Sequence, residues 1–229
     1  YEGLGKFDEA ESFALAFLKK GVREPQLYFL LGNMNFLLKK YDKAIGYFET
    51  CLSLNAESAA SHNVMGAIYI AKGDLDKADQ QLRLAMQIGP KQTNVHYNQA
   101  QIDEKRGQLR EAEAEYLKEL DNSPKHLKAA YNLSRLYRLA GNENKEYEYL
   151  QKCVEIAPKF PVSYFYIARI YLNRGERYQE AVDLVKKAID LKPEKAELPL
   201  GYFLLADLYN RLGNEALSRE YAQKGQELT

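Results

Sequence analysis

One spacing recurs along the whole chain: residues of the same type stand 34 positions apart. Three columns keep this period in phase, namely a glycine column (Gly5, Gly73, Gly107, Gly141 and Gly175), a proline column (Pro90, Pro124 and Pro158) and an alanine column (Ala10, Ala44, Ala78 and Ala112). Lys39 stands at the missing point of the glycine column. A fixed period of this length indicates a repeat array, in which each unit buries its apolar face against its neighbours.

Residues 59–92 show how one unit is built. Apolar residues recur at helical spacing before Gly73 and again after it. Glycine takes a positive φ without steric cost, so Gly73 suits a tight turn between two helices. Pro90 cannot continue a helix and therefore ends the second one. Two helices of about 12–14 residues with two short turns fill the period and leave no room for a strand.

A second set of columns predicts how the helices pack. Small residues recur midway along each first helix, and bulky residues recur at the facing positions of the second helices. The small column is Gly32, Gly66, Ala100, Ser134, Ala168 and Ala206, and the bulky column is Phe48, Leu82, Tyr116, Leu150 and Val185. Small residues let a neighbouring helix approach closely, so the two columns predict an interdigitated helical core.

The residues at fixed positions in unit 59–92 are Met65, Gly66, Tyr69, Gly73, Leu75, Ala78, Leu82, Ala85 and Pro90. This pattern resembles the tetratricopeptide repeat (TPR), and the resemblance extends over essentially the whole chain. It implies an all-α fold, a right-handed α-solenoid of tandem antiparallel helix pairs. In such a TPR-like superhelix the first helices line a concave groove.

The resemblance divides the chain into one continuous TPR array, 1–229. It contains a partial repeat at 1–24 and repeats at 25–58, 59–92, 93–126, 127–160, 161–195 and 199–229. Residues 1–24 are expected to hold the end of a first helix and a complete second helix. The repeat 161–195 has one extra residue in its turn, between Glu176 and Glu180. Because Tyr1 falls inside a repeat, the chain is expected to be a fragment of a longer protein.

Composition and motif searches argue against several functional classes. Lys plus Arg and Asp plus Glu number 32 each, and a net charge of zero argues against nucleic-acid binding by phosphate neutralisation. No apolar run approaches the ~18 residues of a membrane span, so no membrane insertion is expected. The sequence has no glycine-rich phosphate loop, HExxH or GxSxG. We therefore predict no catalytic residues, no cofactor and no enzymatic activity.

The histidines and cysteines also favour a structural interpretation. His62 and His96 share one column, but a metal site needs three or four ligands, so we interpret them as half-buried aromatic side chains and predict no metal site. Cys51 and Cys153 lie three repeats apart, too far for a disulfide, and are interpreted as small buried hydrophobic residues. The lack of structural cysteine pairs favours a soluble, cytoplasmic protein and leaves a bacterial periplasm open.

The concave face that the resemblance implies carries the predicted binding site. Asn98 and Asn132 share a column whose amides can pair with a peptide backbone. Arg135 and Arg169 share another column, whose guanidinium groups suit carboxylates. The predicted peptide-binding residues are Tyr97, Asn98, Gln101, Lys128, Tyr131, Asn132, Arg135, Arg138, Phe165, Tyr166, Arg169 and Asn173. They predict a non-catalytic scaffold that holds an extended protein or peptide segment, with an acidic group, in the groove.

Two alternatives remain open at this point. Arg and Tyr side chains can fall together by chance on the surface of a chain rich in both. The array can also serve as an accessory segment of a larger enzyme, for example a bacterial hydrolase, used for intramolecular docking or oligomerisation. Residues 27–38 and the trio Leu200, Phe203 and Leu204 are apolar nearly all round, which predicts self-association or another covering partner at the two ends.

Overall fold

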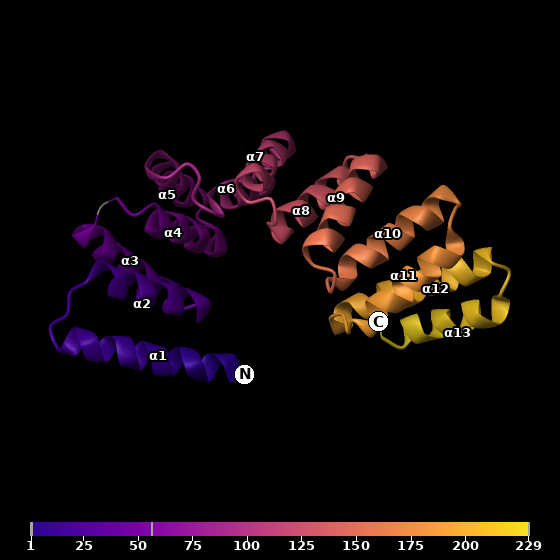
Figure 1. The fold of residues 1–229 in the computed structure, drawn as a ribbon, viewed down its shortest axis with the longest axis horizontal. Coiled ribbons are helices and arrows are strands. Elements are labelled where there is room, and N and C mark those ends of the chain that lie inside the picture. Colours follow the sequence, from indigo (N-terminus) through magenta and orange to yellow (C-terminus); the bar gives the residue numbers. More distant parts are fainter. Residues whose placement is uncertain (1, 56, 229) are drawn as a thin grey trace. The chain divides into compact units, whose positions relative to one another are not determined.

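The computed structural model describes residues 2–55 and 57–228, with side chains described from residue 11 onwards, so Tyr1 lies outside the described part. The described residues form thirteen α-helices and one short 3-10 helix, and no strand is found among them (Figure 1). The helices are α1 Glu2–Lys19, α2 Pro25–Leu37, α3 Tyr41–Leu54, α4 Ala59–Lys72, α5 Leu75–Ile88, α6 Val95–Lys105, α7 Leu109–Asn122, α8 Leu127–Leu139, α9 Glu143–Ile156, α10 Pro161–Arg174, α11 Tyr178–Asp190, η1 Lys195–Glu197, α12 Leu198–Arg211 and α13 Glu215–Gln226. The predicted all-α class is confirmed.

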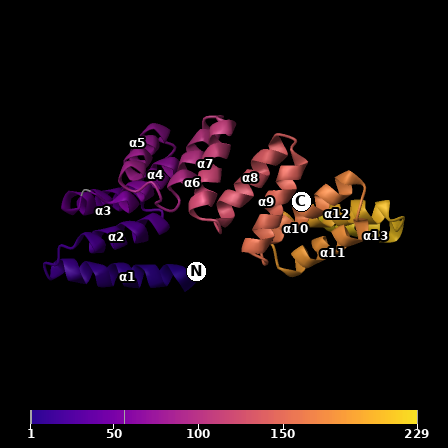
Figure 2. The same ribbon diagram turned by 45° about the horizontal axis from the view of Figure 1, so that its top comes forward.

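The chain consists of two compact units, residues 1–122 and 123–229. In unit 1, α2 pairs with α3, α4 with α5, and α6 with α7. In unit 2, α8 pairs with α9, α10 with α11, and α12 with α13 (Figures 1 and 2). Pro25, Ala59, Leu127 and Pro161 begin both a predicted repeat and a helix. That the two units form one continuous array stays a prediction.

The first helix differs from the expectation for residues 1–24. A turn was expected near Gly5, yet α1 is one uninterrupted helix of 18 residues that includes this glycine. A glycine inside a helix costs only about 1 kcal/mol relative to alanine, so it weakens a helix without ending it. The chain turns only at Gly21, which has φ of 87°.

The glycine column supplies the turn inside the helix pairs. Its members in the described repeats, Gly73, Gly107, Gly141, Gly175 and Gly213, have φ between 70° and 81°. Lys39, at the missing point of the column, takes the same left-handed conformation with φ of 58°. The backbone geometry of this turn is therefore the same whether or not glycine is present.

The small and bulky columns meet in the cores of both units. In unit 1, a Cβ built on Gly32 would lie 2.7 Å from Cζ of Phe48, and one on Gly66 would lie 2.6 Å from Cδ2 of Leu82. Both bulky side chains are fully buried. In unit 2, Leu150 and Val185 are fully buried in one apolar cluster formed by α9 to α12. The small residues thus allow first and second helices to approach at close range.

Candidate functional site

Most of the predicted binding residues lie on the first helices of unit 2. Lys128, Tyr131, Arg135 and Arg138 stand three or four residues apart on α8, which places them on one side of that helix. We call the surface defined by Lys128, Tyr131, Asn132, Arg135, Arg138, Tyr166, Arg169 and Asn173 the first-helix face. Lys128 and Asn173 are exposed, and the others are half-buried.

Two guanidinium groups stack on one tyrosine at the centre of this face. The Cζ of Arg138, from α8, lies 4.2 Å from the ring centroid of Tyr166 on α10. The Cζ of Arg169, one turn along α10, lies 4.8 Å from the same centroid. Cation–π contacts of this length hold the guanidinium planes against the ring. The two arginines are therefore brought together from different helices around Tyr166.

A buried carboxylate lies beneath this pair. Arg169 donates from Nη2 to Oε1 of Glu146 on α9, at 2.6 Å. Glu146 is only 4% exposed. Burial raises the pKa of its carboxyl group, while the charges of Arg169 and Arg138 act against that rise. Glu146 occupies a position in the alanine column, so the departure from the repeat pattern supplies an anchor for Arg169.

Tyr131 extends the aromatic surface beside the two arginines. Burial and the neighbouring Tyr166 raise its pKa to about 12. Its phenol is therefore protonated at neutral pH and keeps a hydrogen atom to donate. The Tyr131 ring also packs edge-on against Phe160, with centroids 5.5 Å apart. The face thus combines guanidinium donors, phenol groups and flat apolar area.

Charge is distributed unevenly between the helices of unit 2. The first helices α8 and α10 carry Lys128, Arg135, Arg138, Arg169 and Arg174 and no carboxylate. The second helices α9 and α11 carry Glu143, Glu146, Glu148, Glu155, Glu180, Asp183 and Asp190 against four lysines. A surface of one sign attracts ligands of the other and speeds their association. The charged side chains of α8 and α10 are all positive.

A polar hollow lies where α10 and α12 end. Leu172 and Asn173 from α10, with Asp207, Asn210 and Arg211 from α12, line a space of about 830 Å³. Asn173 is the predicted binding residue that borders it. The hollow lies in unit 2 and has room for polar side chains of a ligand.

Comparison with known families decides what kind of repeat this is. Models described as tetratricopeptide repeat match residues 1–52, 36–102, 149–183, and both 127–160 and 201–229. The chain belongs to the tetratricopeptide repeat family. TPR proteins typically act in protein–protein interaction. A search of curated proteins found no match.

Solved TPR structures share the fold over most of the chain. The C-terminal part of a TPR repeat-containing protein from Cytophaga hutchinsonii is 20% identical, with a TM-score of 0.70, covering 97% of this chain and 90% of that one. PilF of Pseudomonas aeruginosa is 15% identical with a TM-score of 0.77, covering 89% and 91%. YrrB, a TPR protein with an unusual peptide-binding site, is 15% identical with a TM-score of 0.57, covering 82% and 95%. At these identities the likeness shows the fold alone.

Phe165 is a correction to the predicted binding site. Its side chain is fully buried, and its Cε1 lies 2.7 Å from where a Cβ on Gly201 would be. Adjacent residues on a helix point about 100° apart, so Tyr166 faces outward while Phe165 fills the space left by a glycine of α12. Phe165 belongs to the core between TPR first helices and offers no surface to a ligand.

Asn98, in unit 1, is more deeply buried than a residue that lines an open groove. It is 7% exposed, and its Nδ2 donates to Oδ1 of Asn63 at 2.8 Å. Asn63 in turn donates to the backbone oxygen of Thr93 at 3.0 Å. The asparagines of α4 and α6 therefore hydrogen-bond to each other, and Asn63 also bonds to the backbone of the turn that precedes α6, as is usual for buried polar groups. Asn98 therefore contributes a hydrogen bond inside unit 1, and its role in peptide binding stays a prediction.

The other two predicted residues of unit 1 lie beside Asn98. Tyr97 and Gln101 are half-buried on α6, and Gln101 donates from Nε2 to the Tyr97 hydroxyl at 3.3 Å. The Tyr97 ring packs against Tyr116, with centroids 5.7 Å apart. Part of the surface of both residues remains accessible, and their role in binding stays a prediction.

The two histidines of the shared column make equivalent contacts with second helices. His62 meets Gln81 through Nδ1 at 2.8 Å, and His96 meets Glu115 through Nδ1 at 2.6 Å. Cys51 and Cys153 are both free and buried. Within residues 2–55 and 57–228, no group of three or more His, Cys, Asp or Glu side chains is placed to hold a metal ion.

The apolar ends contain both buried and exposed residues. In α2, Leu31 and Met34 are buried, whereas Leu30 is 49% and Leu37 is 56% exposed. In α12, Phe203 is 38% exposed. Self-association through these residues stays a prediction. None of the described helices is both long enough and apolar enough to cross a membrane.

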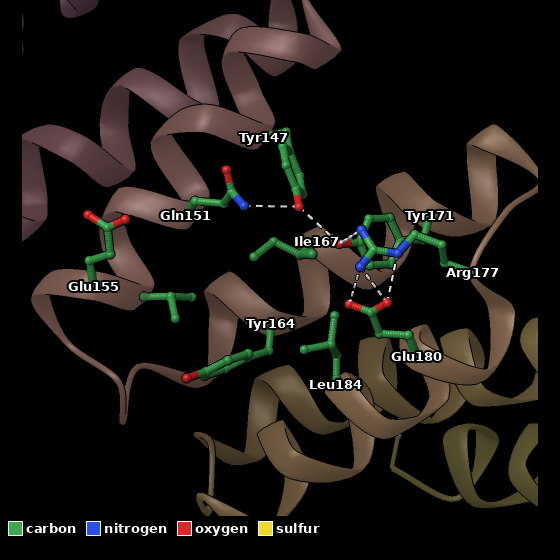
Figure 3. A pocket seen from close by; sticks show the side chains of 10 residues that line it. Tyr147, Gln151, Glu155, Tyr164, Ile167, Tyr171, Arg177, Glu180 and Leu184 are labelled. Carbon is green, nitrogen blue, oxygen red and sulfur yellow. Dashed lines mark hydrogen bonds and ion pairs between the residues drawn. The ribbon is translucent and has the colours of Figure 1, made fainter.

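The sequence interpretation missed a pocket on the second-helix side of unit 2. It lies between α9, α10 and α11 and is bordered by the turn that holds the extra residue of repeat 161–195 (Figure 3). The insertion was the available signal. The repeat pattern gives the position of the inserted residue. It could not show that Arg177 would turn toward Tyr171, because that contact depends on backbone geometry.

Proposed function

We propose that this chain is a non-catalytic TPR scaffold that binds an extended, acidic protein segment on the first-helix face of unit 2. Arg138 and Arg169 hold carboxylates of the segment, and Tyr131 and Tyr166 contact its apolar parts. TPR helices commonly present such faces to other proteins, and YrrB is a similar protein with a peptide-binding site.

One observation carries the proposal: two arginines from different helices are fixed on the ring of Tyr166 above a buried glutamate. A guanidinium that is already stacked loses little side-chain freedom when it binds a carboxylate. Unpaired arginines on a mobile surface would lack this preorganisation. The absence of acidic residues on α8 and α10 adds a favourable field for the same ligand.

The contacts of each basic residue on the first-helix face determine whether it can be replaced without damage to the fold. Arg169 is unsuitable for a first test, because its removal leaves Glu146 buried without its partner and destabilises the fold. Lys128 is exposed, and Arg138 contributes through stacking. The double variant Lys128→Ala/Arg138→Ala therefore removes two positive charges from the face with little effect on the core.

Affinity capture from a lysate of the source cells tests the proposal. The baits are the wild type, Lys128→Ala/Arg138→Ala, and the control Arg219→Ala/Lys224→Ala, which removes two exposed charges from α13. We expect a protein with an acidic segment to be captured by the wild type and the control and lost from the first variant. Equal capture by all three baits would contradict binding on the first-helix face.

A further inference from the structure

A pocket of about 350 Å³ opens between α9, α10 and α11 of unit 2 (Figure 3). Side chains of all three helices and of the turn before α11 line it, among them Tyr147, Glu155, Ile167, Tyr171, Arg177 and Leu184. The volume falls within the range of about 300–1,000 Å³ that is usual for ligand sites. The pocket involves none of the residues of the first-helix face.

One wall of this pocket is a continuous hydrogen-bonded chain. Gln151 donates to the Tyr147 hydroxyl at 3.0 Å, and that hydroxyl lies 2.9 Å from the hydroxyl of Tyr171. Arg177 donates from Nη1 to the same Tyr171 oxygen at 2.6 Å and binds Glu180 through two bonds of 2.7 Å. Figure 3 shows these side chains converging from three helices. Tyr171, at the centre of this chain of hydrogen bonds, is buried, whereas Gln151, Arg177 and Glu180 are exposed at its ends.

The inserted residue of repeat 161–195 makes this wall possible. Arg177 lies in the lengthened turn before α11 and has φ of 54°, a conformation that costs a non-glycine residue about 1–2 kcal/mol. Its guanidinium stacks on Tyr171, with Cζ 4.4 Å from the ring centroid. The stacking, the bond to Tyr171 and the paired bonds to Glu180 offset that cost.

The corresponding columns of unit 1 build no such wall. Positions 68 residues before Tyr147 and Tyr171 hold Asp79 and Asp103. There, Gln99 donates to both carboxylates at 3.2 Å. A charged network thus takes the place of the paired phenols, so the tyrosine wall is a property of this repeat and not of every repeat in the chain.

The remaining surfaces of the pocket define the ligand. Val154, Ile167 and Leu184 supply apolar area, which suits an aliphatic side chain. Glu155 is exposed at the rim, toward the end of α9, and makes no ion pair with a described residue. Of the three charged lining residues, Arg177 and Glu180 pair with each other, and Glu155 is the remaining carboxylate. The charge complementary to this rim is positive.

We propose that the α9–α11 pocket binds an aliphatic side chain of a partner protein segment in which lysine or arginine follows immediately. The aliphatic group enters between Ile167 and Leu184, and the basic side chain pairs with Glu155. This ligand is opposite in charge to the one proposed for the first-helix face, so the two sites accept different segments.

Nuclear magnetic resonance with a defined peptide tests this site. The probe is Ac-Ser-Gly-Leu-Lys-Lys-Gly-Ser-NH₂, titrated into the ¹⁵N-labelled full chain. We expect amide shifts to concentrate in residues 147–155 and 177–184. Glu155→Lys should weaken binding by at least about fivefold, because the rim charge is reversed at an exposed position.

A control variant and two altered probes test whether binding depends on Glu155 and on both parts of the peptide. Asp190→Lys makes the same charge change at an exposed position of α11 that does not line the pocket, and it should leave the affinity within about twofold. Probes with Leu replaced by Ser, or with both lysines replaced by Glu, should not shift these amides. The proposal is overturned if the first probe leaves residues 147–155 and 177–184 unchanged, if Glu155→Lys binds as tightly as the wild type, or if either altered probe binds equally well.

Discussion

At the scale of single residues, the turn at Lys39 shows that the repeat imposes its backbone on whatever residue stands there. Lys39 has φ of 58°, where the glycines of the same column have φ between 70° and 81°. A non-glycine residue in this conformation costs about 1–2 kcal/mol. Glycine avoids that cost but loses more conformational entropy on folding, by about 0.5–1 kcal/mol. The steric cost of the left-handed conformation for lysine is therefore larger than the entropic cost of glycine.

Lys39→Gly should therefore raise the free energy of unfolding, by about 0.5–1 kcal/mol. The reciprocal variant Gly73→Lys should lower it by a similar amount, since nothing lies within 4 Å of a Cβ built on Gly73 and only the backbone conformation is at issue. Urea unfolding followed by circular dichroism measures both changes. A stabilising Gly73→Lys, or a destabilising Lys39→Gly, would contradict this explanation of the glycine column.

The two column histidines differ in the charge of their partners. Both ring nitrogens of His96 face acceptors, with Nδ1 2.6 Å from Glu115 and Nε2 3.2 Å from the oxygen of Pro90. Only the doubly protonated ring donates to both. The hydrogen bond to Glu115 raises the pKa of His96 above 6.5, against the effects of partial burial and of Lys118. His62 faces the neutral Gln81 and forms no ion pair there.

His96 should consequently make stability depend on pH. Because its pKa is raised in the folded state, its contribution is complete below about pH 6.5 and is lost as pH rises through the folded-state pKa. The destabilisation caused by His96→Gln should be larger at pH 6 than at pH 9, by about 0.5–1 kcal/mol. His62→Gln serves as the control and should show no such difference. Equal pH dependence of the two variants would rule out the ion pair as the cause.

At the scale of helices, close approach depends on the small and bulky columns. The ring of Phe48 occupies the space that a Cβ on Gly32 would need, with contacts of 2.7 to 2.9 Å. Phe48 is fully buried, so its ring cannot move aside freely. Gly46, on the paired helix α3, has no neighbour within 4 Å of such a Cβ. The two glycines of this pair thus have different structural roles.

Gly32→Ala and Gly46→Ala should change stability in opposite directions. The first overpacks the interface and should cost about 1–3 kcal/mol. The second replaces glycine inside an exposed stretch of helix and should add up to about 1 kcal/mol. Midpoints of urea unfolding for the two variants provide the comparison. If both variants were destabilised by a similar amount, close contact at Gly32 and helix propensity at Gly46 would not explain their effects.

The columns predict helices and turns better than they predict how deeply a side chain is buried. Turns and helix pairs follow from Gly73, Pro90 and the apolar spacing, because these act locally. The same spacing placed Phe165 and Tyr166 together, although one fills the core opposite Gly201 and the other reaches the surface. Burial depends on which residue a neighbouring repeat supplies. The spacing also could not show the hydrogen bond of Asn98, because its partner Asn63 comes from the preceding repeat.

At the scale of the whole molecule, the proposed function rests on the distribution of charge in unit 2. The chain as a whole has no net charge, yet the first helices α8 and α10 carry only basic residues and the second helices α9 and α11 carry mainly acidic ones. A net charge of zero for the chain therefore conceals an uneven distribution of charge between the surfaces of these helices, and two of the opposite charges pair directly, as Arg169–Glu146 and Arg174–Glu143. We infer that each surface selects a segment of the opposite charge.

Selection from an unbiased peptide library tests whether the first-helix face binds acidic segments. Random peptides displayed on phage are selected in parallel on the wild type, on Lys128→Ala/Arg138→Ala, and on Arg219→Ala/Lys224→Ala. We expect a family of peptides rich in Asp and Glu from the wild type and the α13 control, and loss of that family from the first variant. Selection of no acidic family by the wild type, or of the same acidic family by all three proteins, would contradict an acidic ligand on the first-helix face.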